Sequence, residues 1–230
     1  MKDSVTKNAQ HIAAVSLITL VLLVVWIILM PLSMAIVQPE IGVEEFIELI
    51  KTSGVPFILN YINAVLLTFS ITLLFILLFV DIKSRHPVLA YSGLVFLVMF
   101  SLTNIMVYSS QFIILPELFR DGSSLNEEIL LQLIHIRESS LIYIINMYAY
   151  GFLGVPSVLY GFILMKKNVP GMIAGLLLLL NGIFCWMGLI SLGTGDRFTR
   201  QGTMIGAVAF IAAVFFLYLM YRRKSFDSKH

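Results

Sequence analysis

The chain has 230 residues, of which 59% are hydrophobic and 12% charged, and its mean hydropathy is +0.96. A soluble domain carries about 25% charged residues, so this composition leaves too little polar surface to cover a water-soluble globule. A net charge of +2 without a basic run with interleaved aromatics does not suggest nucleic-acid binding, and the single cysteine, Cys185, excludes an intrachain disulfide and a cysteine metal cluster.

Six uncharged apolar blocks follow one another along the chain, each close to the roughly 20 residues that cross a bilayer. They cover 12–37, 56–80, 88–115, 139–165, 172–193 and 203–221. Backbone amides in lipid must be paired within the protein, and no alternating strand pattern occurs, so we expect helices. The first block is longer than the apolar region of a signal peptide, about 7 to 15 residues, and is expected to remain as a span. The sequence therefore predicts one all-α domain over 1–230, a polytopic membrane protein with six transmembrane helices.

The connecting segments predict the orientation, because Lys and Arg concentrate in cytoplasmic loops. With the N-terminus inside, ten of the fifteen Lys and Arg residues and three of the thirteen Asp and Glu residues fall on the inner side. Both termini are thus predicted to be cytoplasmic. The turns 81–87 and 166–171 are short and charged, and their prolines suit helix starts.

The first outer connection contains a short amphipathic helix at 43–52. Val43, Phe46, Ile47 and Ile50 share one face, and glutamates occupy the other. The acidic face disfavours binding to anionic lipid. A helical cap over the spans and a ligand gate are the two readings of this segment.

The second outer connection carries a capping-box pattern, Ser124 followed by Glu127. We expect a helix to begin there and to continue without a break into the fourth span, which makes the fourth helix an extended one. Gly151, Gly154 and Pro156 could kink it.

Polar residues inside the predicted spans gather toward the outer half and are the candidate ligand-binding residues, since unpaired polar groups are costly in lipid. The second span carries Asn60 and Asn63, one turn apart. On a regular helix, the third span presents four polar residues on one face, and the fourth-span rod presents three more near each other. These seven are Ser101, Asn104, Tyr108 and Gln111, followed by His135, Glu138 and Asn146.

Two readings of these polar stripes remain open: an outward-facing cavity that binds a ligand, or hydrogen bonds between packed helices. No metal site, cofactor or catalytic residue is predicted, because His135 stands alone on the outer side and a zinc site needs three or four ligands. Signatures of rhomboid-like and zinc-dependent membrane proteases are also absent from the sequence.

The stretch from Tyr143 to about Leu189, with its basic pair Lys166 and Lys167 followed by Pro170, resembles an uncharacterised bacterial family of multi-pass membrane proteins. The resemblance implies a location in the bacterial plasma membrane and transfers no functional residue.

The favoured interpretation is a non-enzymatic membrane protein that binds a small or amphipathic molecule, or a partner helix, through the outward-facing stripes. The alternatives are a substrate-binding component of a membrane transporter and an intramembrane hydrolase that uses His135 and Glu138. Expected partners are membrane lipids, such a ligand, and a partner membrane protein or a second copy of the chain, without nucleic acid. Gly171 and Gly175 form a small-residue pair suited to close helix packing within the chain or in a dimer.

Overall fold

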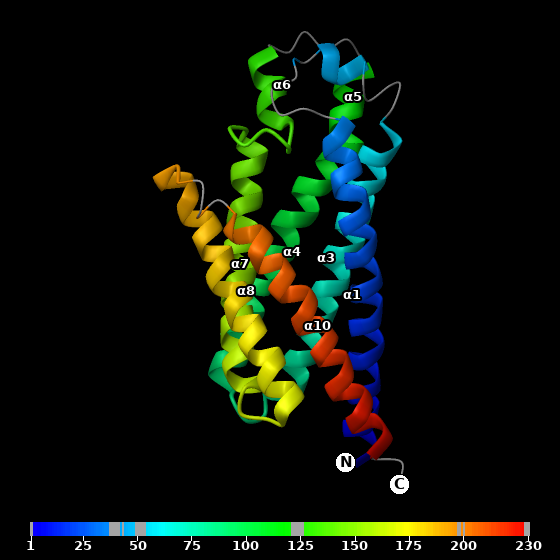
Figure 1. Cartoon of the computed structure of the whole chain (residues 1–230), viewed down its shortest axis with the longest axis vertical. Helices are drawn as coiled ribbons and strands as arrows, with labels where there is room; N and C mark the ends of the chain where they lie inside the picture. The colour runs from blue at the N-terminus through cyan, green and yellow to red at the C-terminus, as the bar shows by residue number, and fades with distance from the viewer. Residues whose placement is uncertain are drawn as a thin grey trace. The chain divides into compact units, whose positions relative to one another are not determined.

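The structure is a computed structural model that describes residues 2–36, 42, 44–48, 54–120, 127–196, 199 and 201–227. All secondary-structure elements in these residues are helices, joined by turns, and there is no strand among them (Figure 1). They are α1 (Lys2–Ile36), α3 (Val55–Ile82), α4 (Pro87–Ser109), the π-helix η1 (Ser110–Ile114), α5 (Leu115–Arg120), α6 (Glu127–Leu133), α7 (Leu141–Leu164), α8 (Val169–Thr194) and α10 (Gly202–Asp227).

Six helices are long and apolar enough to cross a membrane, which confirms the predicted number of spans and the all-α class. They run over Lys7–Ala35, Val55–Ile82, Pro87–Leu118, Leu141–Leu164, Val169–Thr194 and Gly202–Phe226. Large apolar side chains such as Leu66, Leu102 and Val208 are more than half exposed, as expected for residues that face lipid. The helices are consistent with a multi-pass membrane protein.

Two compact units make up the chain. Unit 1 contains Met1–Val21, Phe69–Ser101 and Tyr148–His230, and unit 2 contains Leu22–Thr68 and Leu102–Met147. Their charges are opposite: unit 1 holds twelve Lys and Arg against four Asp and Glu, a net +8, and unit 2 holds three against nine, a net −6. Each unit is therefore expected to attract ions of opposite sign.

Close packing of glycines joins α7 to α8 in unit 1. A Cβ atom on Gly175 would lie 2.5 Å from the carbonyl oxygen of Gly161, and one on Gly182 would lie 2.6 Å from that of Gly154. These distances leave no room for a larger residue, so the backbones of the two helices touch. The small residues of α8 thus serve packing inside the chain.

Polar contacts add to this packing at the centre of unit 1. The Oγ of Ser157 donates to the Oδ1 of Asn181 at 2.9 Å, and the Nδ2 of Asn181 donates to the carbonyl oxygen of Gly206 at 3.0 Å. Asn181 is buried and connects α7, α8 and α10. Hydrogen bonds of this kind satisfy polar groups that lipid cannot solvate.

Local sequence signals explain where two of the spans begin. Pro87 is the first residue of α4, where its missing N–H leaves no hydrogen bond unmade. Asn168 caps α8: its Oδ1 accepts from the N–H of Gly171, and Pro170 follows in the first turn. The predicted role of these prolines is confirmed.

The predicted extended fourth helix is wrong, because α6 ends at Leu133 and α7 begins at Leu141. Ser140 accounts for the restart: its Oγ accepts from the N–H of Tyr143 at 3.1 Å, as an N-cap residue does. The Oε1 of Gln132 accepts from the N–H of Leu141, another of the unpaired donors at this helix start. Ser124, where the rod was expected to begin, lies outside the described residues.

The predicted amphipathic helix at 43–52 falls only partly within the described residues. Positions 44–48 are helical, with Phe46 buried and Glu44, Glu45 and Glu48 exposed. Positions 43 and 49–52 lie outside the described residues, so the length of this helix stays a prediction.

Candidate functional site in unit 2

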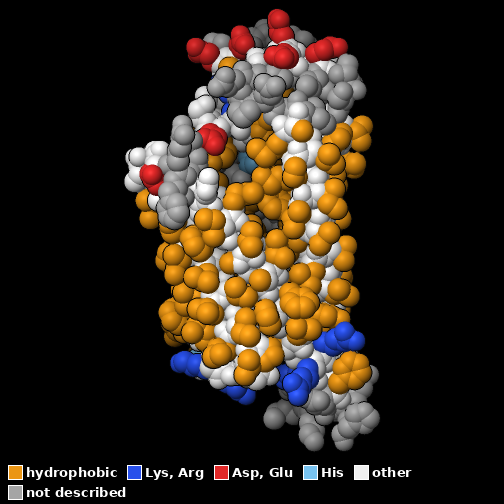
Figure 2. Space-filling view, in the orientation of Figure 1, with side chains coloured by type: hydrophobic (Ala, Val, Ile, Leu, Met, Phe, Trp, Pro, Cys, Tyr) orange, Lys and Arg blue, Asp and Glu red, His pale blue; other side chains and the backbone are white. Residues whose placement is uncertain are grey.

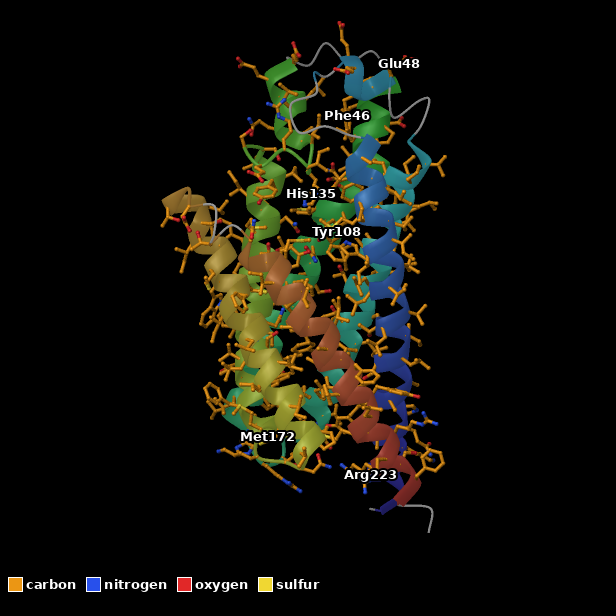
Figure 3. All side chains as sticks on the ribbon, viewed as in Figure 1. Phe46, Glu48, Tyr108, His135, Met172 and Arg223 are labelled. Carbon is orange, nitrogen blue, oxygen red and sulfur yellow. The ribbon has the colours of Figure 1, made fainter. Side chains whose placement is uncertain are left out.

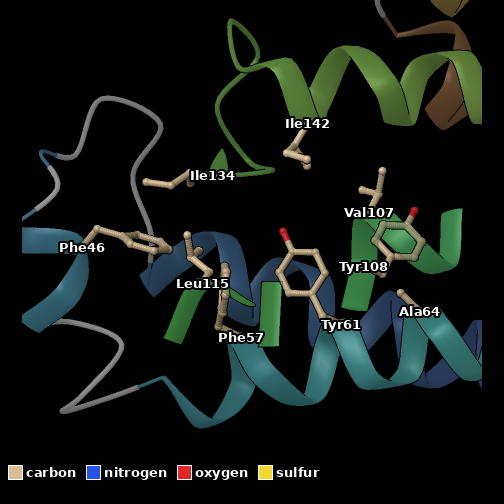
Figure 4. Close-up of a cluster of buried hydrophobic side chains, with 9 residues drawn as sticks. All are labelled: Phe46, Phe57, Tyr61, Ala64, Val107, Tyr108, Leu115, Ile134 and Ile142. Atoms are coloured by element: carbon tan, nitrogen blue, oxygen red, sulfur yellow. The ribbon is translucent and has the colours of Figure 1, made fainter. Parts of the chain in front are cut away.

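A buried aromatic and aliphatic cluster forms the centre of unit 2 (Figure 4). The rings of Phe46 and Phe57 meet edge to face with centroids 5.6 Å apart, and those of Phe57 and Tyr61 at 4.7 Å. Figure 4 shows the hydroxyls of Tyr61 and Tyr108 pointing to the side of the cluster on which Ile142 lies. The tyrosines thus bring polar groups to the edge of an apolar core, as buried tyrosines commonly do.

Gln111 connects the π-helix η1 to the break between α6 and α7. Its Nε2 donates to the carbonyl oxygen of Leu133 at 2.9 Å, and its Oε1 accepts from the N–H of His135 at 3.0 Å. One side chain therefore pairs two backbone groups that the end of α6 leaves free, and it is 1% exposed itself. Single π-helical turns are frequent at functional sites.

His135 lies in this break, among three tyrosines. Its Nδ1 is 2.9 Å from the hydroxyl of Tyr61, and its ring meets those of Tyr61 and Tyr108 edge to face, with centroids 5.5 Å and 5.6 Å apart. The ring of Tyr143 is tilted against it at 6.4 Å. Figure 3 shows His135 and Tyr108 close together. His135 thus has aromatic rings on several sides.

His135 is half-buried as a residue, but the inaccessibility of its ring nitrogen Nε2 keeps the ring desolvated and uncharged. This desolvation lowers the pKa of His135 from 6.5 to about 4, because a desolvated ring resists protonation. The Nε2 of this ring is inaccessible and has no hydrogen-bond partner in the described part of the chain. A neutral imidazole can donate or accept there, depending on its tautomer.

Three amide oxygens of unit 2 share this lack of a partner. The Oδ1 atoms of Asn60, Asn104 and Asn146 are buried and accept no hydrogen bond from the described residues. Their side chains are 8%, 3% and 3% exposed. An unpaired buried polar atom costs on the order of 1 to 3 kcal/mol, so three of them in one unit call for an explanation such as a bound molecule or ordered water.

The structure brings together part of the predicted stripe. Gln111 bonds the backbone of His135, and Tyr108 meets the His135 ring. Asn104 donates through its Nδ2 to the hydroxyl of Thr68 at 3.3 Å, and Asn63 donates to the carbonyl oxygen of Leu22 at 3.1 Å. The last two contacts are the helix-to-helix bonds of the packing interpretation.

Two of the predicted residues lie elsewhere. Ser101 belongs to unit 1, where it is buried. Glu138 is exposed in the segment between α6 and α7, so the helical rod that aligned it with His135 does not exist. The cavity that the stripes predict, and the ligand-binding roles of all nine residues, stay predictions.

Sequence reasoning missed Tyr61 and Tyr143. A tyrosine in a span is suited to packing as well as to hydrogen bonding, so its residue type gives no distinctive signal. Position 61 directly follows Asn60, and position 143 is three residues before Asn146, so each lies within a turn of a predicted polar residue. Only the break before α7 turns His135 toward them.

The site contains uncharged hydrogen-bond acceptors and aromatic ring faces, and it lies in a unit of negative net charge. No group of three or more His, Cys, Asp or Glu residues in the described ranges could hold a metal ion. Aromatic faces and amide oxygens in a unit of net charge −6 suit a ligand that donates hydrogen bonds or carries positive charge.

No family model, curated protein or solved structure matches this chain. The resemblance of the segment from Tyr143 to Leu189 therefore assigns no family, and function has to be argued from the site alone.

Proposed function

We propose that this multi-pass membrane protein binds a small amphipathic molecule in unit 2, beside His135. The observation that carries the proposal is the unpaired Nε2 of His135 together with the unpaired Oδ1 atoms of three buried asparagines. A molecule that donates hydrogen bonds would satisfy these acceptors and recover the free energy that their burial costs.

The class of ligand that fits best is an organic ammonium ion with an apolar tail. Its N–H groups donate to amide oxygens, its charge interacts favourably with tyrosine ring faces, and the net −6 of unit 2 attracts it. His135 is neutral at pH 7 because burial lowers its pKa to about 4, so it does not repel a cation. An apolar tail matches the buried cluster around Phe57.

The experiment is a comparison of decylammonium with decanoate, which have the same apolar tail and opposite charge. Thermal unfolding of the purified protein in a neutral detergent is followed with each compound below the concentration at which it forms micelles. We expect decylammonium to raise the melting temperature and decanoate to leave it unchanged. Equal shifts would show that only the tail is bound.

Two variants separate binding from packing. Asn146→Leu removes an unpaired acceptor, so it should keep or raise the stability of the free protein while abolishing the shift by decylammonium. Asn63→Leu is the matched control: it breaks the bond to Leu22, should lower the stability, and should retain the shift. If decylammonium has no effect on the unaltered protein, the polar groups serve packing and the proposal is wrong.

We further propose that both termini face the cytoplasm and that the membrane is a bacterial plasma membrane. Ten of the fifteen Lys and Arg residues lie in segments that this orientation places inside, which supports cytoplasmic termini.

A further inference from the structure

A groove of about 800 Å³ lies in unit 1, among the ends of α3, α8 and α10. It is lined by four cationic side chains and one carboxylate: Arg85, Lys167, Arg223, Lys224 and Asp81. Figure 3 shows Arg223 near the C-terminal end of α10 and Met172 in the first turns of α8, at the same end of unit 1. On the face seen in Figure 2, Lys and Arg side chains border the apolar surface of unit 1.

Asp81 organises the two lysines of the groove. Its Oδ2 accepts from the Nζ of Lys167 at 2.5 Å and from the hydroxyl of Tyr221 at 2.7 Å, and its Oδ1 lies 3.5 Å from the Nζ of Lys224. The Asp81 side chain is only 13% exposed, whereas those of Lys167 and Lys224 are 26% and 44% exposed. Each ammonium has three N–H donors, so both lysines keep donors for a second anion.

The two arginines of the groove differ from its lysines in their pairing. Arg85 and Arg223 are exposed and form no ion pair with any residue that the structure describes. With Asp81 offsetting one of the four cations, the lining has a net charge of +3. Arginine donates in a fork that matches the oxygens of a phosphate.

The N-terminal end of α8 and the apolar residues beside it indicate what kind of anion fits the groove. The groove includes Asn168, Val169 and Pro170, the start of α8, whose N-terminal end carries partial positive charge. Val169 is 65% exposed and Met172 47% exposed, so apolar surface continues from the charged groove along the helix. A phosphate attached to acyl chains meets both surfaces, whereas a free phosphate meets only the first.

We propose that this groove binds the phosphate of an anionic phospholipid headgroup, between Arg85, Arg223 and the two lysines that Asp81 holds, with the acyl chains along α8. Basic pockets between transmembrane helices on the cytoplasmic side are suited to such headgroups. The inference rests on unit 1 alone and is independent of the ligand proposed for unit 2.

The groove offers neighbouring residues of equal charge as controls. Arg222, next to Arg223, bonds the hydroxyl of Tyr218 and does not line the groove. Lys83 lies over the ring of Phe79 and is also outside it. The double variant Arg85→Gln/Arg223→Gln therefore changes the net charge as much as Lys83→Gln/Arg222→Gln, but only the first alters the groove.

The test is native mass spectrometry of the full chain in neutral detergent, titrated with phosphatidylglycerol or with phosphatidylcholine of the same acyl chains. We expect one phosphatidylglycerol to bind more tightly than phosphatidylcholine. The groove variant should lose roughly tenfold or more in affinity, because it removes the charge-assisted hydrogen bonds of two arginines, and the control variant should lose about twofold or less. Thermal unfolding verifies that both variants fold.

Three results would overturn the proposal. Equal loss of affinity in both variants would mean that the lipid senses only total charge. Equal binding of the two lipids would remove the role of the anionic headgroup. Displacement of phosphatidylglycerol by millimolar inorganic phosphate, with retained stability, would assign the groove to a free phosphate.

Discussion

The hydroxyl of Tyr61 lies 2.9 Å from the Nδ1 of His135. This contact joins α3 to the break between α6 and α7 and leaves the Nε2 as the one ring nitrogen of His135 to interact with a ligand. The hydroxyl can donate to a neutral ring or accept from it, and the choice sets the tautomer, so a ligand can select whether Nε2 donates or accepts.

The stability of the protein should fall in acid because of His135. Its pKa is lowered to about 4 in the folded chain, against 6.5 when unfolded, so the unfolded state binds the proton first. The contribution is complete above pH 6.5 and decreases as the pH falls toward 4, by about 3 kcal/mol in total. Thermal unfolding between pH 7.5 and 4.5 should show a weaker decline in His135→Gln than in the unaltered protein. Identical declines would mean that the ring is already charged or exposed.

Replacing Gln111 should destabilise unit 2. Gln111→Leu leaves the carbonyl of Leu133 and the N–H of His135 without partners, at a cost of about 2 to 4 kcal/mol. Gln132→Leu is the control, because its bond to Leu141 is exposed and water can replace it. Hydrogen exchange should increase at 133–141 in the first variant only. Unchanged exchange in Gln111→Leu would contradict its bridging role.

Gly175 and Gly193 of α8 should respond oppositely to alanine. A Cβ on Gly175 meets the Gly161 oxygen at 2.5 Å and the Met165 nitrogen at 2.6 Å, and both are backbone atoms that cannot turn aside. Gly175→Ala should cost about 1 to 3 kcal/mol. Nothing lies within 4 Å of a Cβ on Gly193, so Gly193→Ala should be neutral or slightly stabilising. Equal melting temperatures for the two variants would contradict close contact between α7 and α8.

The proposed orientation predicts a labelling pattern in intact cells. A cysteine at Ser225 should resist a membrane-impermeant maleimide, and one at Glu127 should react. Cys185 is buried and should give little background. Labelling of Ser225→Cys from the medium, with Glu127→Cys protected, would contradict the proposed orientation.

Hydrophobic length predicted the six spans because the requirement to pair backbone groups in lipid is nearly independent of sequence detail. The prolines at 87 and 170 likewise indicated helix starts by a local steric rule. The fourth helix was wrongly predicted to begin at Ser124 and to run unbroken into its span; instead Ser140 caps a new helix, and Gln111 pairs backbone groups in the break. That partner is on a different helix, which no local pattern reveals.

Several residues of the candidate site could be predicted from the sequence, but their contacts could not. Gln111 and Tyr108 were singled out by helical spacing, and both reach His135, although the π-turn interrupts the regular helix at Gln111. Tyr61 was missed because a span tyrosine gives no distinctive signal. The only sequence signal for the basic groove of unit 1 was the excess of Lys and Arg in the predicted inner loops. The groove itself was not predictable, because Asp81 contacts Lys167 and Lys224, which are 86 and 143 positions away in the sequence.

The ligand site can be tested directly with an experimental density map of unit 2, determined from protein that is purified in a neutral detergent and supplied with decylammonium. We expect non-protein density larger than a water molecule, about 3 Å from the Nε2 of His135 and in reach of Asn146. A map in which Nε2 and the amide oxygens bond only to protein groups or to single waters would contradict the account.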